Sequence, residues 1–429
     1  MTQVVLLNKI KKYFELTSSN ANNQKFYLTS FSITPGFLVL KNLQDKSLSF
    51  IFKKKIYLLS LISSVRLIKP KIYYKKIIPN YNSIILTWGN IKNFDKNGNF
   101  NDKYFNQKSS NNKNFLWFII SLDNKKPKKI KNNIIIFFHN NLNLSNLFLF
   151  SFKLLKDFLL SPMQFFKKRT FFYLENLSIK LWSKLEIYIK TKKIKKFLIP
   201  YEAQPFQNYI YSKVKHYDKN IKTLGYVHST QLFPTHLFKR EGSPDKLFVH
   251  GDDQRHHCTK YLGWKRKEVN LCPSFRFFIK NKKKFYNKIF LPYDFFNGHL
   301  ILDAFNKLLK KNLSQISPNM KIMLHPHTQS SKKHKILKNQ IKTILRNHKF
   351  NKKIKPPLTI VIGGTSTILE ALETGVKPYH IFEDDLTICS TKVWPNIKIN
   401  KIHDNCFQYQ LKKKIIVLII KNIKKNLIF

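Results

Sequence analysis

The chain has 429 residues, enough for two or three domains, and its 43% hydrophobic and 14% aromatic content excludes global disorder. With 78 Lys and Arg against 23 Asp and Glu, the net charge is +55, so the surface attracts polyanions such as nucleic acid, anionic lipid or phosphorylated sugar. Only seven of the basic residues are Arg and the Lys runs are scattered, so we interpret the charge mainly as solvated surface and expect no specific nucleic-acid partner.

The first third of the chain is predicted to be rich in β-structure. β-branched and aromatic residues dominate four runs, at 25–34, 58–69, 83–88 and 133–139. Between the last two runs, the polar and Asn-rich stretch 93–114 is predicted to be a loop or an ordered insertion.

Helical periodicity follows at 144–160 and 174–190. The wider segment 142–172 is rich in Leu and Phe with interleaved Lys, a pattern that fits a helix on a membrane surface as well as one in a core. We expect the core helix. The sequence has no run of 18 apolar residues, so no spanning helix is expected, and its short apolar start predicts no secretory signal.

From residue 195 onward, predicted strands alternate with predicted helices. The strands are expected at 197–200, 221–228, 246–250, 268–273, 289–292, 321–325, 358–362 and 378–382. The helices are expected at 208–217, 254–262, 300–311, 332–346 and 368–374, and the tail 406–429 is also predicted to be helical. This alternation is typical of parallel α/β structure.

The polar stretch 280–288 divides the α/β series into two. We therefore predict an α/β fold of two Rossmann-like domains facing across a cleft, with an N-terminal domain at 1–280 and a C-terminal domain at 281–429 that ends in a helix. Ligands of such sheets bind beyond the carboxyl ends of the strands, so functional residues are expected there.

A glycine-rich turn after the strand at 358–362 is the first candidate site. Two glycines allow close approach of the backbone, and hydroxyl groups follow at the start of a helix, which suits an anion such as a phosphate. Glu370 lies on the same side of that helix as Ser366 and would suit a ribose diol. An ordinary capped helix is the alternative. The candidate nucleotide-binding residues here are Gly363, Gly364, Thr365, Ser366, Thr367 and Glu370.

Histidines at another predicted strand end form the second candidate. His325 and His327 flank Pro326 and point to one face of the strand, where His325 could donate to a phosphate. No carboxylate nearby completes a metal site, and a strand end without a ligand is the alternative.

Glu202 and His228 are the third candidate, because each follows a short apolar run. A carboxylate and an imidazole on one rim can act as general base and acid toward a hydroxyl group. The alternative is a capping Glu beside a hydrogen-bonded His. The acidic runs Asp252-Asp253 and Glu383-Asp384-Asp385 lack the context of a metal clamp and are predicted to be turns.

The four cysteines, Cys258, Cys272, Cys389 and Cys406, are predicted to be free thiols in a reducing cytoplasm. They form no closely spaced pair. His256 and His257 lie next to Cys258, but no second close pair completes a zinc cluster there.

Short motifs between residues 83 and 382 resemble bacterial surface-carbohydrate glycosyltransferases of the GT-B type, which act in lipopolysaccharide and capsule biosynthesis. The motifs are Thr87-Trp88-Gly89, Asp102-Lys103-Tyr104-Phe105, Tyr201-Glu202-x-Gln204-Pro205, Gly225-Tyr226-x-His228-Ser229, His325-Pro326 and Ser366-Thr367-x-x-Glu370-Ala371. The chain departs from that group at Phe206 and Gln207, where Trp and Glu are expected.

The resemblance implies roles for these residues. His325, Ser366 and Thr367 would bind the donor phosphates, Glu370 the ribose, and Glu202 and His228 would lie on the acceptor side. No metal or other cofactor is expected. The implied protein is a cytoplasmic transferase, with a possible peripheral place on the inner face of the membrane, that moves a sugar from a nucleotide-sugar donor to a glycan or lipid-linked acceptor.

Three alternatives stay open at this point. A nucleotide-sugar epimerase has the same architecture but needs no acceptor. A basic nucleic-acid-binding protein would use the charge, and an inactive relative would only scaffold other enzymes.

Overall fold

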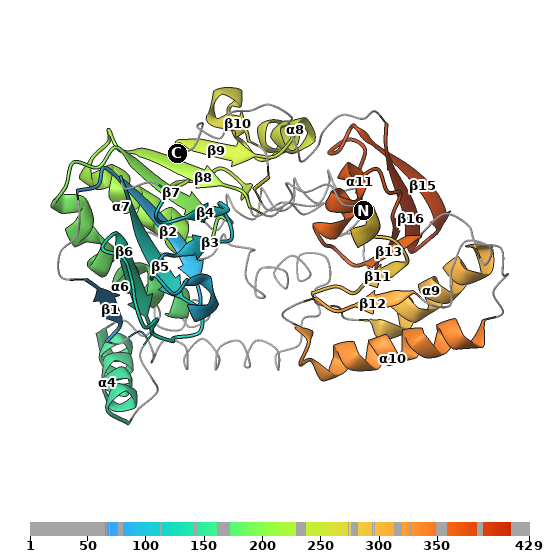
Figure 1. The fold of residues 1–429 in the computed structure, drawn as a ribbon, viewed down its shortest axis with the longest axis horizontal. Coiled ribbons are helices and arrows are strands. Elements are labelled where there is room, and N and C mark those ends of the chain that lie inside the picture. Colours follow the sequence, from blue (N-terminus) through green and yellow to red (C-terminus); the bar gives the residue numbers. More distant parts are fainter. Residues whose placement is uncertain are drawn as a thin grey trace.

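The computed structural model contains two parallel-rich β-sheets with flanking helices, a mixed α/β fold (Figure 1). It describes residues 65, 67, 69–75, 80–111, 114–139, 144–160, 172–228, 237–272, 274–275, 282–293, 295, 297–312, 320–325, 328–348, 358–383 and 389–412.

The first sheet has eight strands in the order β1-β6-β5-β2-β7-β8-β9-β10. Only β1 runs antiparallel to its neighbour, β6. The strand bounds are β1 (Lys71–Tyr74), β2 (Ser83–Gly89), β5 (Phe115–Ser121), β6 (Ile134–Phe138), β7 (Lys196–Pro200), β8 (Lys222–Tyr226), β9 (Lys246–Val249) and β10 (Val269–Leu271).

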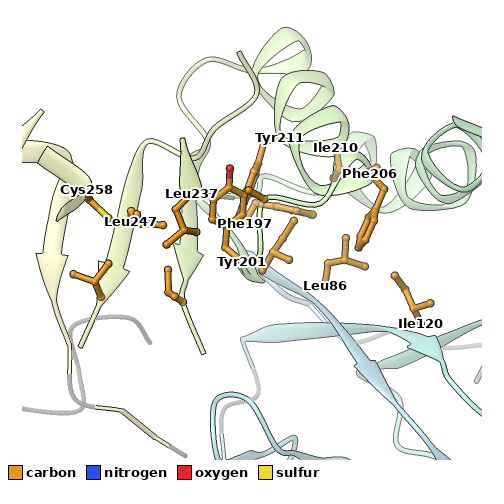
Figure 2. Packing of buried hydrophobic residues seen from close by; sticks show 14 of the residues in the cluster. Leu86, Ile120, Phe197, Tyr201, Phe206, Ile210, Tyr211, Leu237, Leu247 and Cys258 are labelled. Carbon is orange, nitrogen blue, oxygen red and sulfur yellow. The ribbon is translucent and has the colours of Figure 1, made fainter. Parts of the chain in front are cut away.

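Both faces of this sheet are buried, which explains why β5 and β6 are apolar without interruption. Ile84 and Leu86 point to one face of β2, where α6 (Phe172–Lys190) and α7 (Pro205–Tyr217) pack. Figure 2 shows side chains of β2, β7 and α7 converging in that cluster. Ile85 points to the other face, which Phe100 and Phe105 of the 93–114 insertion cover.

The described residues of the 93–114 insertion, 93–111 and 114, are ordered, which agrees with the second of the two predicted alternatives. It contains the short hairpin of β3 (Asn101–Asp102) and β4 (Gln107–Lys108). Phe100 and Phe105 have no exposed surface, so burial of these two rings anchors a stretch that is otherwise polar.

The second sheet has six strands in the order β12-β11-β13-β14-β16-β15. The first four are parallel, and β16 runs antiparallel to both its neighbours. The bounds are β11 (Lys288–Phe290), β12 (Lys321–Met323), β13 (Thr359–Ile362), β14 (Tyr379–Ile381), β15 (Ile397–His403) and β16 (Cys406–Leu411), with helices α9 (Gly298–Asn312), α10 (Lys332–Asn347) and α11 (Thr367–Glu373).

Helix α8 (Asp252–Tyr261) of the first sheet contacts the segment 389–397 of the second. The Asp253 carboxylate accepts hydrogen bonds from the Asn396 backbone N–H at 3.1 Å and from its side-chain amide at 2.6 Å. The ring of His257 stacks on Trp394 with 6.3 Å between centroids and 9° between planes. Asp252 and Asp253 therefore form the first turn of a helix, and the predicted turn is wrong. Residues 384–385 of the other predicted turn lie outside the described part.

Most strands and helices from residue 83 to 382 confirm the predicted positions within a few residues. The prediction missed β1, β5 and β15. The predicted helix at 406–429 is wrong at 406–411, which form β16 because they pair with both β14 and β15; residues 413–429 lie outside the described part. The run 25–34 also lies outside it, and in 58–69 only three residues are described, of which Val65 is helical.

Helix α4 (Leu144–Leu160) has the predicted bounds, but the expectation of a core helix is wrong. Of its described side chains, only Phe150 is buried, and Leu144 and Phe148 are 84% and 73% exposed. No helix in the described part of the chain is long and apolar enough to cross a membrane. All four cysteines are free, as predicted, and all four are buried.

Candidate functional site

Glu202 and His228 meet at the carboxyl edge of the first sheet. β7 and β8 are parallel neighbours, and each of the two residues is the second one after its strand. The His228 Nε2 atom lies 3.0 Å from the Glu202 Oε1 atom. The His228 side chain is 6% exposed and that of Glu202 is 30% exposed, so the carboxylate is the part of the pair that solvent reaches.

Hydrogen bonds from α7 hold the Glu202 segment in a tight turn. Ala203 has a φ of 52°, a left-handed conformation that needs support from its surroundings. The Gln207 side-chain oxygen accepts hydrogen bonds from the backbone N–H groups of Glu202 and Gln204, both at 3.0 Å. The Gln204 amide in turn donates to the Glu202 Oε2 atom at 2.7 Å, so the carboxylate is held from both sides.

The contacts of Gln207 also explain why this residue is not Glu, the residue expected at this position from the resemblance. Its amide nitrogen donates to the carbonyl of Pro200 at 2.8 Å while its oxygen accepts the two N–H groups. A Glu at this buried position could accept but not donate. Arg240, which is half-buried, donates to the carbonyl of Ala203 and completes the support of the turn.

Asp102 and Tyr104 of the insertion belong to the same site, and the sequence analysis assigned them no role. The Tyr104 ring packs edge-on against His228, with 4.5 Å between centroids. The Asp102 carboxylate accepts hydrogen bonds from the Thr87 hydroxyl at 2.6 Å and from the backbone N–H groups of Tyr104 and Phe105 at 2.8 and 2.6 Å. Burial raises the pKa of Asp102 to about 6, against the lowering effect of these hydrogen bonds and of His228.

The next strand end adds a second histidine. His250 follows β9, and its Nδ1 atom lies 3.2 Å from the carbonyl of Cys272. Burial lowers the pKa of His250 to about 4, so its ring is neutral near pH 7. The buried Nδ1 atom of His228 has no hydrogen-bond partner within the described residues. Three adjacent strand ends thus carry Glu202, His228 and His250, an arrangement suited to moving a proton at a substrate hydroxyl.

The glycine-rich turn lies at the carboxyl edge of the second sheet. Gly363 has a φ of 72°, and a Cβ atom there would lie 2.8 Å from the Cβ of Pro292, which follows β11. Its N–H donates to the carbonyl of Ile381 at 2.8 Å, and its carbonyl lies 3.0 Å from the Nε2 atom of His380. The turn is therefore fixed on both sides and has room for glycine alone.

One hydroxyl group of this turn, that of Thr365, binds the start of α11. The Thr365 hydroxyl accepts a hydrogen bond from the Thr367 N–H at 3.2 Å and lies 3.0 Å from the Thr367 hydroxyl. Ser366, at the N-cap position, makes no side-chain capping bond. The Glu370 carboxylate pairs with the Lys284 ammonium group at 2.5 Å through its Oε1 atom. This local network accounts for part of the sequence pattern as helix capping.

His325 follows β12, next to β11 in the sheet, and its ring packs edge-on against Tyr293 with 5.2 Å between centroids. His325 and Gly363 therefore share the carboxyl edge of one sheet, whereas Glu202 and His228 belong to the other. Pro326 and His327 lie outside the described residues. Among the described residues, no group of three or more His, Cys, Asp or Glu side chains is placed to hold a metal ion.

Replacing Gly363 tests how tightly the turn is built. Gly363→Ala is expected to lower the free energy of unfolding by about 1–3 kcal/mol, because it adds left-handed strain and a contact with Pro292. Gly364→Ala is the control, since Gly364 is exposed and its φ is not positive; its expected change is within about 0.5 kcal/mol. Urea unfolding measures both, and equal effects of the two variants would contradict the prediction.

Comparisons with known proteins give distant structural likenesses. No family model and no curated protein sequence matches the chain. A glycosyltransferase from Rickettsia africae ESF-5 is similar with a TM-score of 0.34 and 12% identity, over 73% of this chain and 81% of that one. The N-terminal domain of trehalose-6-phosphate phosphatase from Candida albicans has the same TM-score and identity, over 75% of this chain and 92% of that one.

Proposed function

We propose that the chain is a glycosyltransferase of the GT-B type, built from Rossmann-like domains at 1–280 and 281–429, that moves a sugar from a nucleotide-sugar donor to a hydroxyl group of a glycan or lipid-linked acceptor. The observation that carries the proposal is the Glu202–His228 pair, held with 3.0 Å between Nε2 and Oε1 at the carboxyl edge of a parallel sheet.

In this proposal Glu202 is the general base. Its carboxylate takes the proton of the acceptor hydroxyl, whose oxygen then forms the new bond to the anomeric carbon of the donor sugar. The bond from that carbon to the donor phosphate breaks, and the nucleotide leaves with the electron pair. His228 and Gln204 each hold one carboxylate oxygen, so the base is oriented before the acceptor arrives.

The second sheet supplies the donor side. His325 and the hydroxyl groups of Thr365, Ser366 and Thr367 would contact the phosphates, together with backbone N–H groups of the glycine turn. Donors placed in advance stabilise the charge that develops on the leaving nucleotide. Glu370 keeps one oxygen for a ribose hydroxyl, because Lys284 occupies only Oε1.

Two alternative functions differ from a transferase in the molecules that they require. An epimerase of the same architecture would convert the nucleotide-sugar without an acceptor. A polyanion binder is favoured by the net charge of +55 and would bind DNA or RNA with an affinity that falls steeply as salt rises. Product analysis with and without acceptor separates the transferase from the epimerase.

Nucleotide binding tests the donor side. At high salt, one class among CMP, UDP and GDP is expected to raise the melting temperature of the parent protein, since high salt suppresses unspecific anion binding. Ser366→Ala is expected to weaken that nucleotide about tenfold through loss of a hydrogen bond to a charged group. Ser183→Ala is the control, because this exposed serine lies on α6 of the other sheet.

Two outcomes would contradict the donor assignment. Equal weakening by both serine variants would argue against the turn. No selective shift for any nucleotide, together with salt-sensitive binding of DNA or RNA, would favour the polyanion binder.

A further inference from the structure

Helix α4 presents an apolar stripe to solvent. Residues spaced three and four apart line one side of a helix. The large side chains on this side of α4 are 55–84% exposed, and they are Leu144, Phe148, Phe152, Leu155 and Leu159. Figure 1 shows α4 projecting from the first sheet beyond the end of β1. A continuous apolar surface of this kind marks a binding face rather than ordinary solvated surface.

The length of α4 limits how it can meet a membrane. Its 17 residues span about 25 Å at 1.5 Å per residue, and none of the described helices qualifies as a membrane span. A helix with one broad apolar side that cannot cross the bilayer can lie along it, with that side in the boundary between head groups and acyl chains.

The net charge of the chain favours an anionic bilayer over a second copy of the chain as the partner of the α4 stripe. A second copy would bring another net charge of +55 against the first, and the two copies would repel each other. An anionic bilayer attracts the same charge, by about 1 kcal/mol for each Lys close to its surface. Lys156 is exposed on α4. Lys71 is exposed opposite Phe138 at the end of β6, the strand that precedes the helix, and Lys69 is exposed two residues before Lys71.

We propose that α4 docks the protein on an anionic lipid bilayer, with the Leu and Phe stripe inserted among the acyl chains and the surrounding lysines at the lipid phosphates. The docking follows from α4 itself and does not require the proposed function. If that function holds, docking also brings the site close to the bilayer. The helix α4 begins just after β6, at the same sheet edge as Glu202 and His228. Strands β6 and β7 are three strand spacings apart, which is about 14 Å. The site would then face acceptors carried by lipids.

Flotation with vesicles tests the docking. The parent protein is expected to float with vesicles of phosphatidylcholine and phosphatidylglycerol and much less with phosphatidylcholine alone. The double variant Phe148→Ser with Phe152→Ser should lower the partition coefficient at least tenfold, because two apolar rings no longer enter the bilayer. Both positions are exposed, so the variant should fold. Ile187→Ser, at an exposed apolar position of α6, is the matched control and should float like the parent.

The other outcomes are distinguishable. If the double variant floats like the parent, attraction by charge alone is sufficient and α4 docking is wrong. If the parent sediments as a dimer without lipid and the double variant as a monomer, a second copy covers the stripe and the proposal is likewise overturned. The nucleotide-induced melting shift of the double variant reports on the proposed function separately, so either proposal can fail alone.

Discussion

Glu202→Gln is expected to lower the rate of sugar transfer by a factor of about 10²–10⁴ while leaving nucleotide binding unchanged. The amide has nearly the same shape as the carboxylate, so the turn built by Gln204 and Gln207 should persist. What the variant loses is the ability to accept the proton of the acceptor hydroxyl. The measurement is the turnover number at saturating donor and acceptor, with the nucleotide-induced melting shift measured in parallel.

Two further variants sharpen this test. Glu186→Gln is the matched control, because that carboxylate pairs with Lys190 on the surface of α6. It should keep full activity. His228→Ala removes the group that holds one oxygen of Glu202, and a reduced rate is expected there also. Full transfer activity in both Glu202→Gln and His228→Ala would exclude this pair from catalysis.

Strand-end reasoning predicted that Glu202 and His228 lie at one sheet edge, as they do, because it needs only local information. Their catalytic role stays a prediction. Each residue follows a short apolar run, and the carboxyl ends of parallel strands share one edge. The same reasoning could not find Asp102 and Tyr104. Tyr104 reaches His228 because Phe100 and Phe105 of the same insertion are buried against the sheet, a contact that no local pattern encodes.

Two other differences have related causes. The apolar spacing of α4 is the same whether the helix packs in a core or lies on a surface, so periodicity alone gave its bounds but not its exposure. The segment 406–411 became a strand through pairing with β14 and β15, and the missed strand β15 left the tail without a visible partner. Tertiary pairing thus overrode a helical pattern.

The two sheets share one continuous cluster of buried side chains, and Trp394 lies within it. The cluster includes Val249 and Cys258 beside the first sheet and Val361 of β13. Trp394 has no exposed surface and stacks on His257 of α8. Nearby, the Tyr261 hydroxyl donates to the carbonyl of Lys392 at 3.1 Å, and Asp253 holds Asn396. A break at this point should therefore loosen one sheet from the other.

Trp394→Ala is expected to lower the free energy of unfolding by about 3–5 kcal/mol, the usual cost of emptying a fully buried aromatic position. The unfolding curve should also change shape. With the contact between α8 and segment 389–397 weakened, the two sheets should melt in separate steps, whereas the parent is expected to melt in one. Differential scanning calorimetry measures both effects.

Trp182→Ala is the control that separates a loss of coupling between the two sheets from a simple loss of packing. Trp182 is half-buried on α6 and packs on the first sheet, away from the contact between the sheets. Its removal should cost less and should leave a single transition. A single transition in Trp394→Ala, with a loss below about 1 kcal/mol, would mean that Trp394 does not couple the sheets. Separate steps in Trp394→Ala alone would instead identify α8 and segment 389–397 as the contact that fixes the proposed acceptor and donor sides relative to each other.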